Sequence, residues 1–319
     1  MNEKVKCESF QKILNVVYKQ SSLQKKKLEK HFLKRGDGYF QDAECFAAHY
    51  LGYLDAQGIS LEDAVASYTK LCSDMMRCQI FFKRTGKYPI NSALVAEQEV
   101  YSDPLRMQAY MIGLALSLFL WETHYEIYDF FRKSFLDRAM QVCSYLEVGP
   151  GHGLFLTHAV KHVPDGIPID VVDISVASLE ITRSIVSSFG LSGRPINYYH
   201  EDFLRFSSER KYDFITMGEV LEHVERPQQF LSKLRDLLSY QGVAFISTCA
   251  NCPAIDHVFQ FNTAEEIRAM LITRGFSILQ DRALPVEDIP MEEVIAQKVT
   301  VNYCALIVRN NHWQGAGNA

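Results

Sequence analysis

Two carboxylates and an imidazole stand close together in the second half of the chain, and another imidazole follows. Residues 218–224 read GEVLEHV and come directly after a predicted strand. If a helical turn begins at Glu219, the side chains of Glu219, Glu222 and His223 share one face. His257 follows the next predicted strand, and loops after neighbouring parallel strands meet at one edge of a sheet. Oxygen and imidazole ligands suit magnesium, manganese or iron, so the pattern indicates a divalent-metal site.

A glycine-dense turn precedes this group. An apolar strand over residues 143–148 delivers Glu147 to a turn that contains Gly149, Gly151 and Gly153, and a helical run follows. Glycine allows a sharp turn and a close approach of backbone N–H groups to a ligand. Strand, glycine turn and helix form the first unit of a nucleotide-binding sheet. The acidic residue before the first glycine disfavours a pyrophosphate dinucleotide and suits a ligand with a cationic amino acid end.

Two further predicted strands end in acidic residues. Residues 169–174 read IDVVDI and contain Asp173, at the position where a doubly wound fold binds ribose hydroxyls. Residues 196–203 read INYYHEDF, which places Asp202 to accept a hydrogen bond from an adenine amino group. A fourth strand is predicted over residues 212–219. These strand ends therefore suit a nucleoside.

With these motifs in order, roughly residues 135–310 resemble the class I S-adenosylmethionine-dependent methyltransferases, whose motifs take the form E-x-G-x-G-x-G, D, D-F and a later D-x-[IV]. The resemblance implies an α/β fold with a Rossmann-like, seven-stranded, mostly parallel sheet and S-adenosylmethionine at its carboxyl edge. The methionine end would lie against the glycine turn, the ribose against Asp173 and the adenine against Asp202. The residues implied to bind the cofactor are Glu147, Gly149, Gly151, Gly153, Asp173, Ile174, Asp202, Phe203 and Gly218.

The E-x-x-E-H run and the D-H-x-F at residues 256–259 resemble the metal-binding set of the plant small-RNA 2′-O-methyltransferases. The E-x-x-E-H part is also similar to the ubiquinone-pathway O-methyltransferases. An alternative stays open, because L-E-H-V after the fourth strand also occurs in methyltransferases that bind no metal. Carried over by position, the metal ligands are Glu219, Glu222, His223 and His257.

Other side chains stand near this chemistry. Cys249 and Cys252 form a C-x-x-C just before His257, and without a thioredoxin-like context or a second pair we interpret them as core or loop thiols. His124 and Tyr128 are neighbours at helical spacing in an aromatic segment. They either pack the helices onto the sheet or border the substrate, which His124 could orient or deprotonate. The candidate catalytic residues are therefore His124 and His257.

The N-terminal part shows helical periodicity and little strand character. Residues 60–63 form a capping box, and Asp103 is a predicted N-cap before a long helical stretch that reaches about Leu136. In the resembling family such extensions cover the active site and set substrate choice. We expect residues 100–135 and about 283–298 to border the acceptor.

The C-terminal half completes the sheet. A buried strand is predicted over residues 242–248, and a capping box at residues 263–266 begins a helix. Residues 276–279 and 299–308 read as a final antiparallel pair. The predicted organisation is a helical lid domain over residues 1–137, a methyltransferase domain over 138–310 and a flexible tail over 311–319.

Composition narrows the expected surroundings and partners. The 319 residues include 48% hydrophobic and 22% charged residues, as in globular proteins, and the net charge of −5 disfavours RNA as a partner. No secretory signal opens the chain, its longest apolar run is too short for a bilayer, and its eight cysteines lack a framework spacing. We expect a cytoplasmic protein with no membrane partner. No pattern sets the oligomeric state, and a homodimer is one option.

The expected reaction is in-line transfer of a methyl group to a positioned acceptor. A divalent metal would chelate two acceptor oxygens and lower the pKa of one. Catechol-like O-methylation and α-keto acid C-methylation in small-molecule biosynthesis both fit this scheme. The alternatives are a metal-free small-molecule N- or O-methyltransferase and an RNA 2′-O-methyltransferase.

Overall fold

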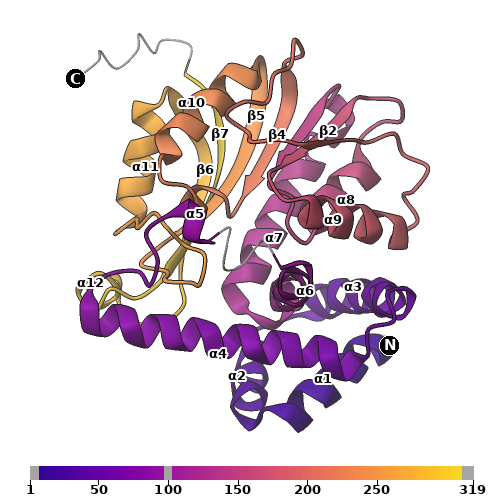
Figure 1. The fold of residues 1–319 in the computed structure, drawn as a ribbon, viewed down its shortest axis with the longest axis vertical. Coiled ribbons are helices and arrows are strands. Elements are labelled where there is room, and N and C mark those ends of the chain that lie inside the picture. Colours follow the sequence, from indigo (N-terminus) through magenta and orange to yellow (C-terminus); the bar gives the residue numbers. More distant parts are fainter. Residues whose placement is uncertain (1–6, 97–102, 311–319) are drawn as a thin grey trace.

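The computed structural model describes residues 7–96 and 103–310 (Figure 1). Its strands are β1 (Tyr145–Val148), β2 (Ile169–Asp173), β3 (Asn197–His200), β4 (Tyr212–Gly218), β5 (Leu238–Ala250), β6 (Phe276–Pro285) and β7 (Val301–Arg309). They form a seven-stranded sheet in the order β3-β2-β1-β4-β5-β7-β6, and β7 runs antiparallel to both neighbours. The predicted Rossmann-like, mostly parallel α/β sheet is confirmed.

Helices cover both faces of this sheet. One face carries α7 (Glu122–Leu136), α8 (Leu154–His162) and α9 (Val176–Ser188), and the other carries α10 (Pro227–Leu237) and α11 (Ala264–Thr273). Successive residues of a strand point to opposite faces, so Tyr145 packs under α7 while Leu146 packs under α10 and α11. The buried strands therefore read as continuous apolar runs, with Glu147 as a buried exception.

The N-terminal helices form a group of their own below one edge of the sheet in Figure 1. They are α1 (Glu8–Gln20), α2 (Ser22–Phe32), α3 (Asp37–Ala56), α4 (Leu61–Thr85), α5 (Ala93–Ala96) and α6 (Pro104–Leu120). Helices α4 and α6 cross closely at Gly113, where an added Cβ would lie 3.1 Å from the Leu71 Cβ. Their apolar cluster also includes Leu154 and Ile185 from α8 and α9, so the two parts of the chain share a core.

Helix starts follow the predicted caps. The Ser60 hydroxyl accepts from the Asp63 backbone N–H at 3.1 Å, and the Thr263 hydroxyl accepts from the Glu266 N–H at the same distance. The Asp103 carboxylate accepts from the backbone N–H of Leu105 at 2.9 Å. These caps confirm the predicted starts of α4, α11 and α6. A short helix, α12 (Met291–Ala296), stands between β6 and β7.

The predicted single helical stretch from Asp103 to Leu136 is wrong, because the chain breaks at Trp121. That residue has an extended backbone, with φ −114° and ψ 132°, between α6 and α7. Its indole N–H donates to the Tyr68 hydroxyl at 3.1 Å, and its ring meets His124 edge-on. The Trp121 side chain therefore contacts both α4 and α7 at the point where the helix breaks. Local helix propensity does not predict this break.

Two other predictions fall partly on residues that the structure does not describe. The predicted tail over residues 311–319, and residues 1–6 and 97–102 of the predicted lid domain, lie outside the described residues. Within residues 7–96 and 103–310, no helix combines the length and the apolar character needed to cross a bilayer.

Phe131 on α7 tests how strongly the helices depend on the sheet. Its buried ring meets those of Phe155 at 4.8 Å and Phe245 at 5.0 Å. We expect Phe131→Ala to lower the free energy of unfolding by about 3–5 kcal/mol, because it leaves a cavity in the core. Denaturant unfolding measures this, with Leu136→Ala as the exposed control on the same helix. Equal losses in the two variants would contradict the packing described.

Candidate active site

A cavity of about 540 Å³ opens between the carboxyl edge of the sheet and helices α6 and α7. This volume lies in the usual range for small-molecule and cofactor sites. The helical side is apolar, with Met107, Met111 and Leu118 among its lining residues. The predicted cofactor residues that line the cavity are Glu147, Gly149, Gly151, Asp173, Ile174, Asp202, Phe203 and Gly218.

The glycine turn between β1 and α8 has a backbone that side chains rarely adopt. Gly149 has φ +64°, and an added Cβ there would lie 2.7 Å from the Val220 Cγ2 atom. Gly153 also has positive φ, but it does not line the cavity, and its Cβ would lie 3.1 Å from the Thr182 Cα atom. This glycine allows α8 to pack against α9, and its contact with the cofactor stays a prediction.

Glu147 is a buried carboxyl at the floor of the cavity. It accepts a hydrogen bond from the Tyr145 hydroxyl, and burial raises the pKa of Glu147 to about 8. The free protein therefore holds this group mostly neutral at neutral pH. A cationic ligand would favour its ionised form.

The two acidic strand ends keep oxygen atoms at the cavity. Asp173 accepts from the Ser175 backbone N–H at 2.8 Å and from the Ser178 hydroxyl at 2.7 Å, while burial raises the pKa of Asp173. Asp202 accepts from the Leu204 N–H at 2.9 Å. Both carboxylates are thereby held in fixed orientations by the backbone that follows them.

The turn after β4 differs from the predicted helical turn. Glu219 has φ +53°, and only a short 3-10 turn, η3 (Leu221–His223), follows it. Glu222 is buried behind the cavity wall, whereas Glu219 and His223 line the cavity. Glu222 Oε2 accepts from the Thr248 hydroxyl at 2.7 Å, but the Oε1 atoms of Glu222 and Glu219 have no hydrogen-bond partner.

Two histidines complete this group, and their hydrogen bonds fix how they face it. The backbone carbonyl of Asp256 lies 3.1 Å from His223 Nδ1, and the carbonyl of Cys252 lies 2.6 Å from His257 Nδ1. A carbonyl oxygen only accepts, so Nδ1 is the donor in both rings, and a metal ion would bind each ring through Nε2. Metal-binding histidines typically donate their second N–H in this way.

Charge around these rings favours a cation. Burial lowers the pKa of His223. Burial also lowers the pKa of His257, but hydrogen bonding and charge from Cys252, with charge from Asp256 and Glu222, outweigh it and raise this pKa to about 10. Burial raises the pKa of Glu222 well above its usual range, and the charge of Glu219 adds to this. Either a proton or a metal cation would compensate the negative charge of the carboxylates in this group.

The predicted metal ligands come together as overlapping triads. Ligand atoms of Glu222, His223 and His257 lie within 4.8 Å of one another, and Glu219 groups within the same limit with Glu222 and Cys249. The convergence of the β4 and β5 loops is therefore as expected. The unpartnered carboxylate oxygens and the two oriented imidazoles fit a divalent cation.

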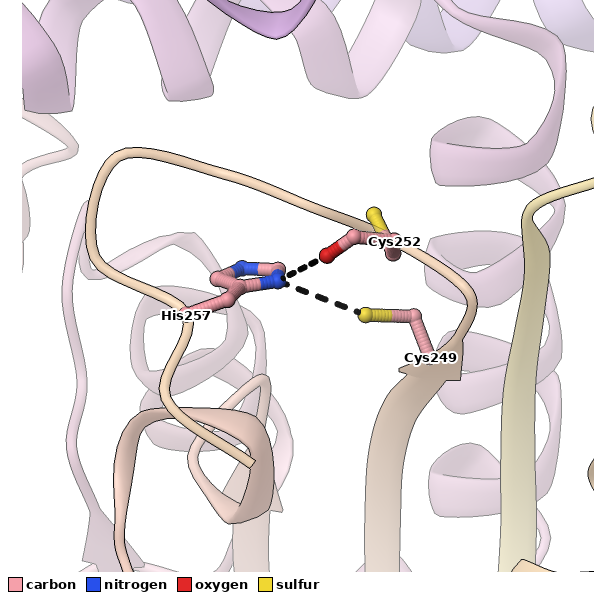
Figure 2. A group of neighbouring side chains, drawn as sticks. All are labelled: Cys249, Cys252 and His257. Atoms are coloured by element: carbon pink, nitrogen blue, oxygen red, sulfur yellow. Dashed lines mark hydrogen bonds between the residues drawn. The ribbon is translucent and has the colours of Figure 1, made fainter. Parts of the chain in front are cut away.

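The C-x-x-C thiols lie behind His257. Figure 2 shows Nδ1 of His257 turned toward the Cys252 carbonyl and the Cys249 thiol, and the other ring nitrogen turned away. Cys249 Sγ lies 3.8 Å from that Nδ1 atom. Cys249, Cys252 and His257 also have the spacing of a metal triad, but it needs the nitrogen that the carbonyl already occupies. We assign these thiols to the support of His257.

His124 lines the cavity on the side opposite the sheet. This position is the one that the substrate-bordering interpretation of His124 requires. Ser117 Oγ lies 2.7 Å from the Leu114 carbonyl oxygen, so its single hydrogen is donated there. His124 Nδ1, at 2.9 Å from the same Oγ, must therefore be the donor. Burial, with a contribution from nearby His152, lowers the pKa of His124 to about 4. The neutral ring has its lone pair on Nε2.

Tyr128 does not line the cavity, so the structure favours the packing interpretation of this residue over a contact with the substrate. Its ring packs edge-on against Phe119 and Phe155, and Arg132 lies over it at 5.5 Å. Because the helix breaks at Trp121, the side of α7 that carries Tyr128 does not continue the side of α6 that lines the cavity. No described residue of 283–298 lines the cavity either. Of the two segments predicted to border the acceptor, only residues 100–135 reach the cavity, through α6 and α7.

Some lining residues were not singled out from the sequence, namely Met107, Met111, Leu118 and Asn302, whereas His152 was expected to shape the glycine turn. Met107, Met111 and Leu118 recur at helical spacing on α6, which is a signal for one apolar face but not for a cavity. His152 Nδ1 accepts from the Leu154 backbone N–H at 3.2 Å, and burial lowers the pKa of His152 to about 4. Asn302 reaches the cavity from β7, because that strand is inserted next to β5.

The strand order, the antiparallel last strand and the glycine turn define the fold of a class I methyltransferase. A family model described as a methyltransferase domain matches residues 120–284, which is just over half of the chain. The chain belongs to this family and carries an S-adenosylmethionine-dependent methyltransferase domain.

Curated relatives include ubiquinone biosynthesis O-methyltransferases. The one from Rickettsia canadensis is 26% identical over 186 residues, covering 52% of this chain and 76% of that protein. The one from Histophilus somni is 35% identical over 109 residues, covering 32% of this chain and 43% of that protein. Matches to two further Rickettsia proteins of this name span 34% and 40% of their lengths.

Solved structures share the fold at low sequence identity. An O-methyltransferase family protein from Burkholderia thailandensis has a TM-score of 0.54 at 12% identity, over 81% of this chain and 73% of that one. The mitomycin 7-O-methyltransferase MmcR has a TM-score of 0.53 at 12% identity, over 78% of this chain and 70% of that one. These likenesses concern the fold alone.

Glu147 should give the protein a measurable pH dependence. Its pKa rises from 4.5 to about 8 on folding, so between these values the folded protein holds a proton that the unfolded chain has lost. The free energy of unfolding therefore falls as the pH rises through this range, by up to about 1.4 kcal/mol per pH unit. Denaturant unfolding at about pH 5.5 and about pH 7.5 should show a drop in wild type that Glu147→Gln lacks. Parallel pH dependences in the two proteins would contradict this account.

Proposed function

We propose that the protein methylates an oxygen of an enclosed small molecule with the help of a divalent metal ion. Glu222, His223 and His257 are the proposed ligands, with Glu219 beside them, and magnesium, manganese and iron are the proposed ions. The observation that carries this proposal is the pair of imidazoles whose Nδ1 atoms both donate to loop carbonyls. A ligand atom of each histidine lies within 4.8 Å of a Glu222 oxygen, and the Oε1 atoms of Glu222 and Glu219 have no hydrogen-bond partner.

The chain's own residues supply position and shielding. When bound, S-adenosylmethionine provides the methyl group, and the ion lowers the pKa of an acceptor oxygen. The glycine turn, Asp173 and Asp202 are the proposed contacts of the cofactor along the sheet edge. The apolar side chains of α6 exclude water above the acceptor, which strengthens electrostatic interactions beneath them.

The lining of the cavity favours a neutral acceptor with two adjacent oxygens, such as a catechol. No described residue that lines it is a lysine or an arginine. The phosphates of an RNA would therefore lack the long basic side chains that usually bind them, which disfavours RNA. The names of the curated relatives, ubiquinone biosynthesis O-methyltransferases, agree with methyl transfer to an oxygen of a small molecule.

His124 is the proposed proton acceptor for the nucleophilic oxygen. Its Nδ1–H is held by Ser117, and its neutral ring keeps a lone pair on Nε2 at the cavity wall. Because burial lowers the pKa of His124 to about 4, this base is available throughout the neutral range.

Metal removal tests the main proposal. We expect EDTA treatment to reduce transfer of a labelled methyl group to a catechol by about 100-fold or more, with recovery on adding back magnesium, manganese or iron. His223→Ala should resist that recovery, while the affinity for S-adenosylhomocysteine serves as the folding control. A parallel panel of α-keto acids and RNA separates the acceptor classes. Full activity after EDTA treatment would overturn the metal role in favour of a metal-free enzyme.

Replacement of His124 tests the proposed base. We expect His124→Ala to lower kcat by about 100-fold or more because it removes the proton acceptor, with little change in S-adenosylhomocysteine affinity. Tyr128→Phe is the matched control, since Tyr128 packs outside the cavity and should keep its activity. If His124→Ala instead loses cofactor binding and keeps its turnover per folded molecule, His124 is a packing residue.

A further inference from the structure

The helical part of the chain, which comprises α1 to α7 within residues 7–136, forms hydrogen bonds with the loop after β5 at two places. Tyr88, which follows α4, accepts a hydrogen bond on its hydroxyl from the Cys252 backbone N–H at 2.8 Å. Tyr110, on α6, donates from its hydroxyl to the Asp256 carboxylate at 3.0 Å. Both contacts join segments that are more than one hundred residues apart in sequence.

These two loop residues are the ones that orient the candidate metal ligands. The carbonyl of Cys252 accepts from His257 Nδ1, and the carbonyl of Asp256 accepts from His223 Nδ1. One tyrosine therefore holds the residue that fixes one histidine, and the other tyrosine holds the residue that fixes the second. Each pathway runs from a tyrosine hydroxyl through one loop residue to one imidazole.

We infer that Tyr88 and Tyr110 are positioning residues for the metal centre, through which the helical part sets the orientation of His257 and His223. This inference rests on the proposed metal site. Neither tyrosine is a proposed ligand, and each acts through the loop residue that it holds.

The surroundings of Tyr88 make its hydrogen bond consequential. The side chain is buried, and its ring lies 5.5 Å from that of Phe82 and 6.5 Å from that of His257. Removal of the hydroxyl leaves the buried Cys252 N–H without this acceptor, so the peptide can rotate to find another. This N–H and the carbonyl to which His257 Nδ1 donates lie in adjacent peptide units that meet at the Cys252 Cα atom, so a shift of residue 252 displaces the carbonyl as well.

Tyr110 acts on a second part of the same loop. Asp256 is fully buried, and its carboxylate also lies 3.6 Å from His223 Nδ1. The tyrosine therefore restrains both the carboxylate and, through the backbone, the carbonyl that face this imidazole. Loss of an outer partner of a metal ligand typically weakens metal affinity 10- to 100-fold.

Metal affinity, rather than turnover, tests the inference. We would titrate the full chain with Mn²⁺ alone, following free Mn²⁺ by electron paramagnetic resonance, for wild type, Tyr88→Phe and Tyr110→Phe. We expect each variant to bind Mn²⁺ about 10- to 100-fold more weakly, with unchanged S-adenosylhomocysteine affinity. Tyr125→Phe is the matched control, because its hydroxyl donates to Asp42 within the helical part at 3.1 Å.

The outcomes separate this inference from the proposal beneath it. No Mn²⁺ binding by wild type overturns the proposed metal centre and the inference with it. Wild-type binding that both variants match within about twofold overturns the inference alone, since the expected loss is at least tenfold. An equal loss in Tyr125→Phe would show general loosening and also overturn it.

Discussion

Burial of carboxyl groups beside one cavity is the constraint on which the site depends. Burial disfavours the charged forms of Glu147, Asp173 and Glu222. Hydroxyl and backbone donors answer part of this demand, but Glu222 keeps one oxygen without a partner. Buried charge is costly unless it is paired, so this edge of the sheet favours cationic ligands. A sulfonium cofactor with an amino group and a divalent ion would both meet that demand.

Much of the sheet and of its acidic edge could be predicted from short-range patterns. The glycine turn, the acidic end of β2 and the caps at Ser60 and Thr263 are each determined within a few residues, where local conformation and hydrogen bonding act directly. The antiparallel pair at the C-terminus was also predicted, although β6 extends to Pro285 because it pairs with β7 along its whole length. Local signals of this kind identify elements and the ends that carry side chains into the site.

Features that depend on distant partners could not be predicted in this way. The break at Trp121 accompanies a hydrogen bond to Tyr68, more than fifty residues earlier, which no local pattern reveals. The left-handed backbone of Glu219 replaces a helical turn that the spacing of the acidic residues allowed. Gly153 has the same type and spacing as the cavity glycines, and only the position of α9 shows that it serves packing. Tyr128 lies outside the cavity for the related reason that α6 and α7 do not form one continuous helix.

The links from Tyr88 and Tyr110 to the β5 loop have a consequence for how such a chain can diversify. The proposed cofactor contacts lie within the sheet domain, so a recombined protein with foreign N-terminal helices would inherit them complete. The orientation of both imidazoles would be inherited only if the donor helices also presented hydroxyls at these two places. If the helices select the acceptor, as proposed, they are therefore not freely interchangeable parts, because a change of helices would also change how the two imidazoles are held.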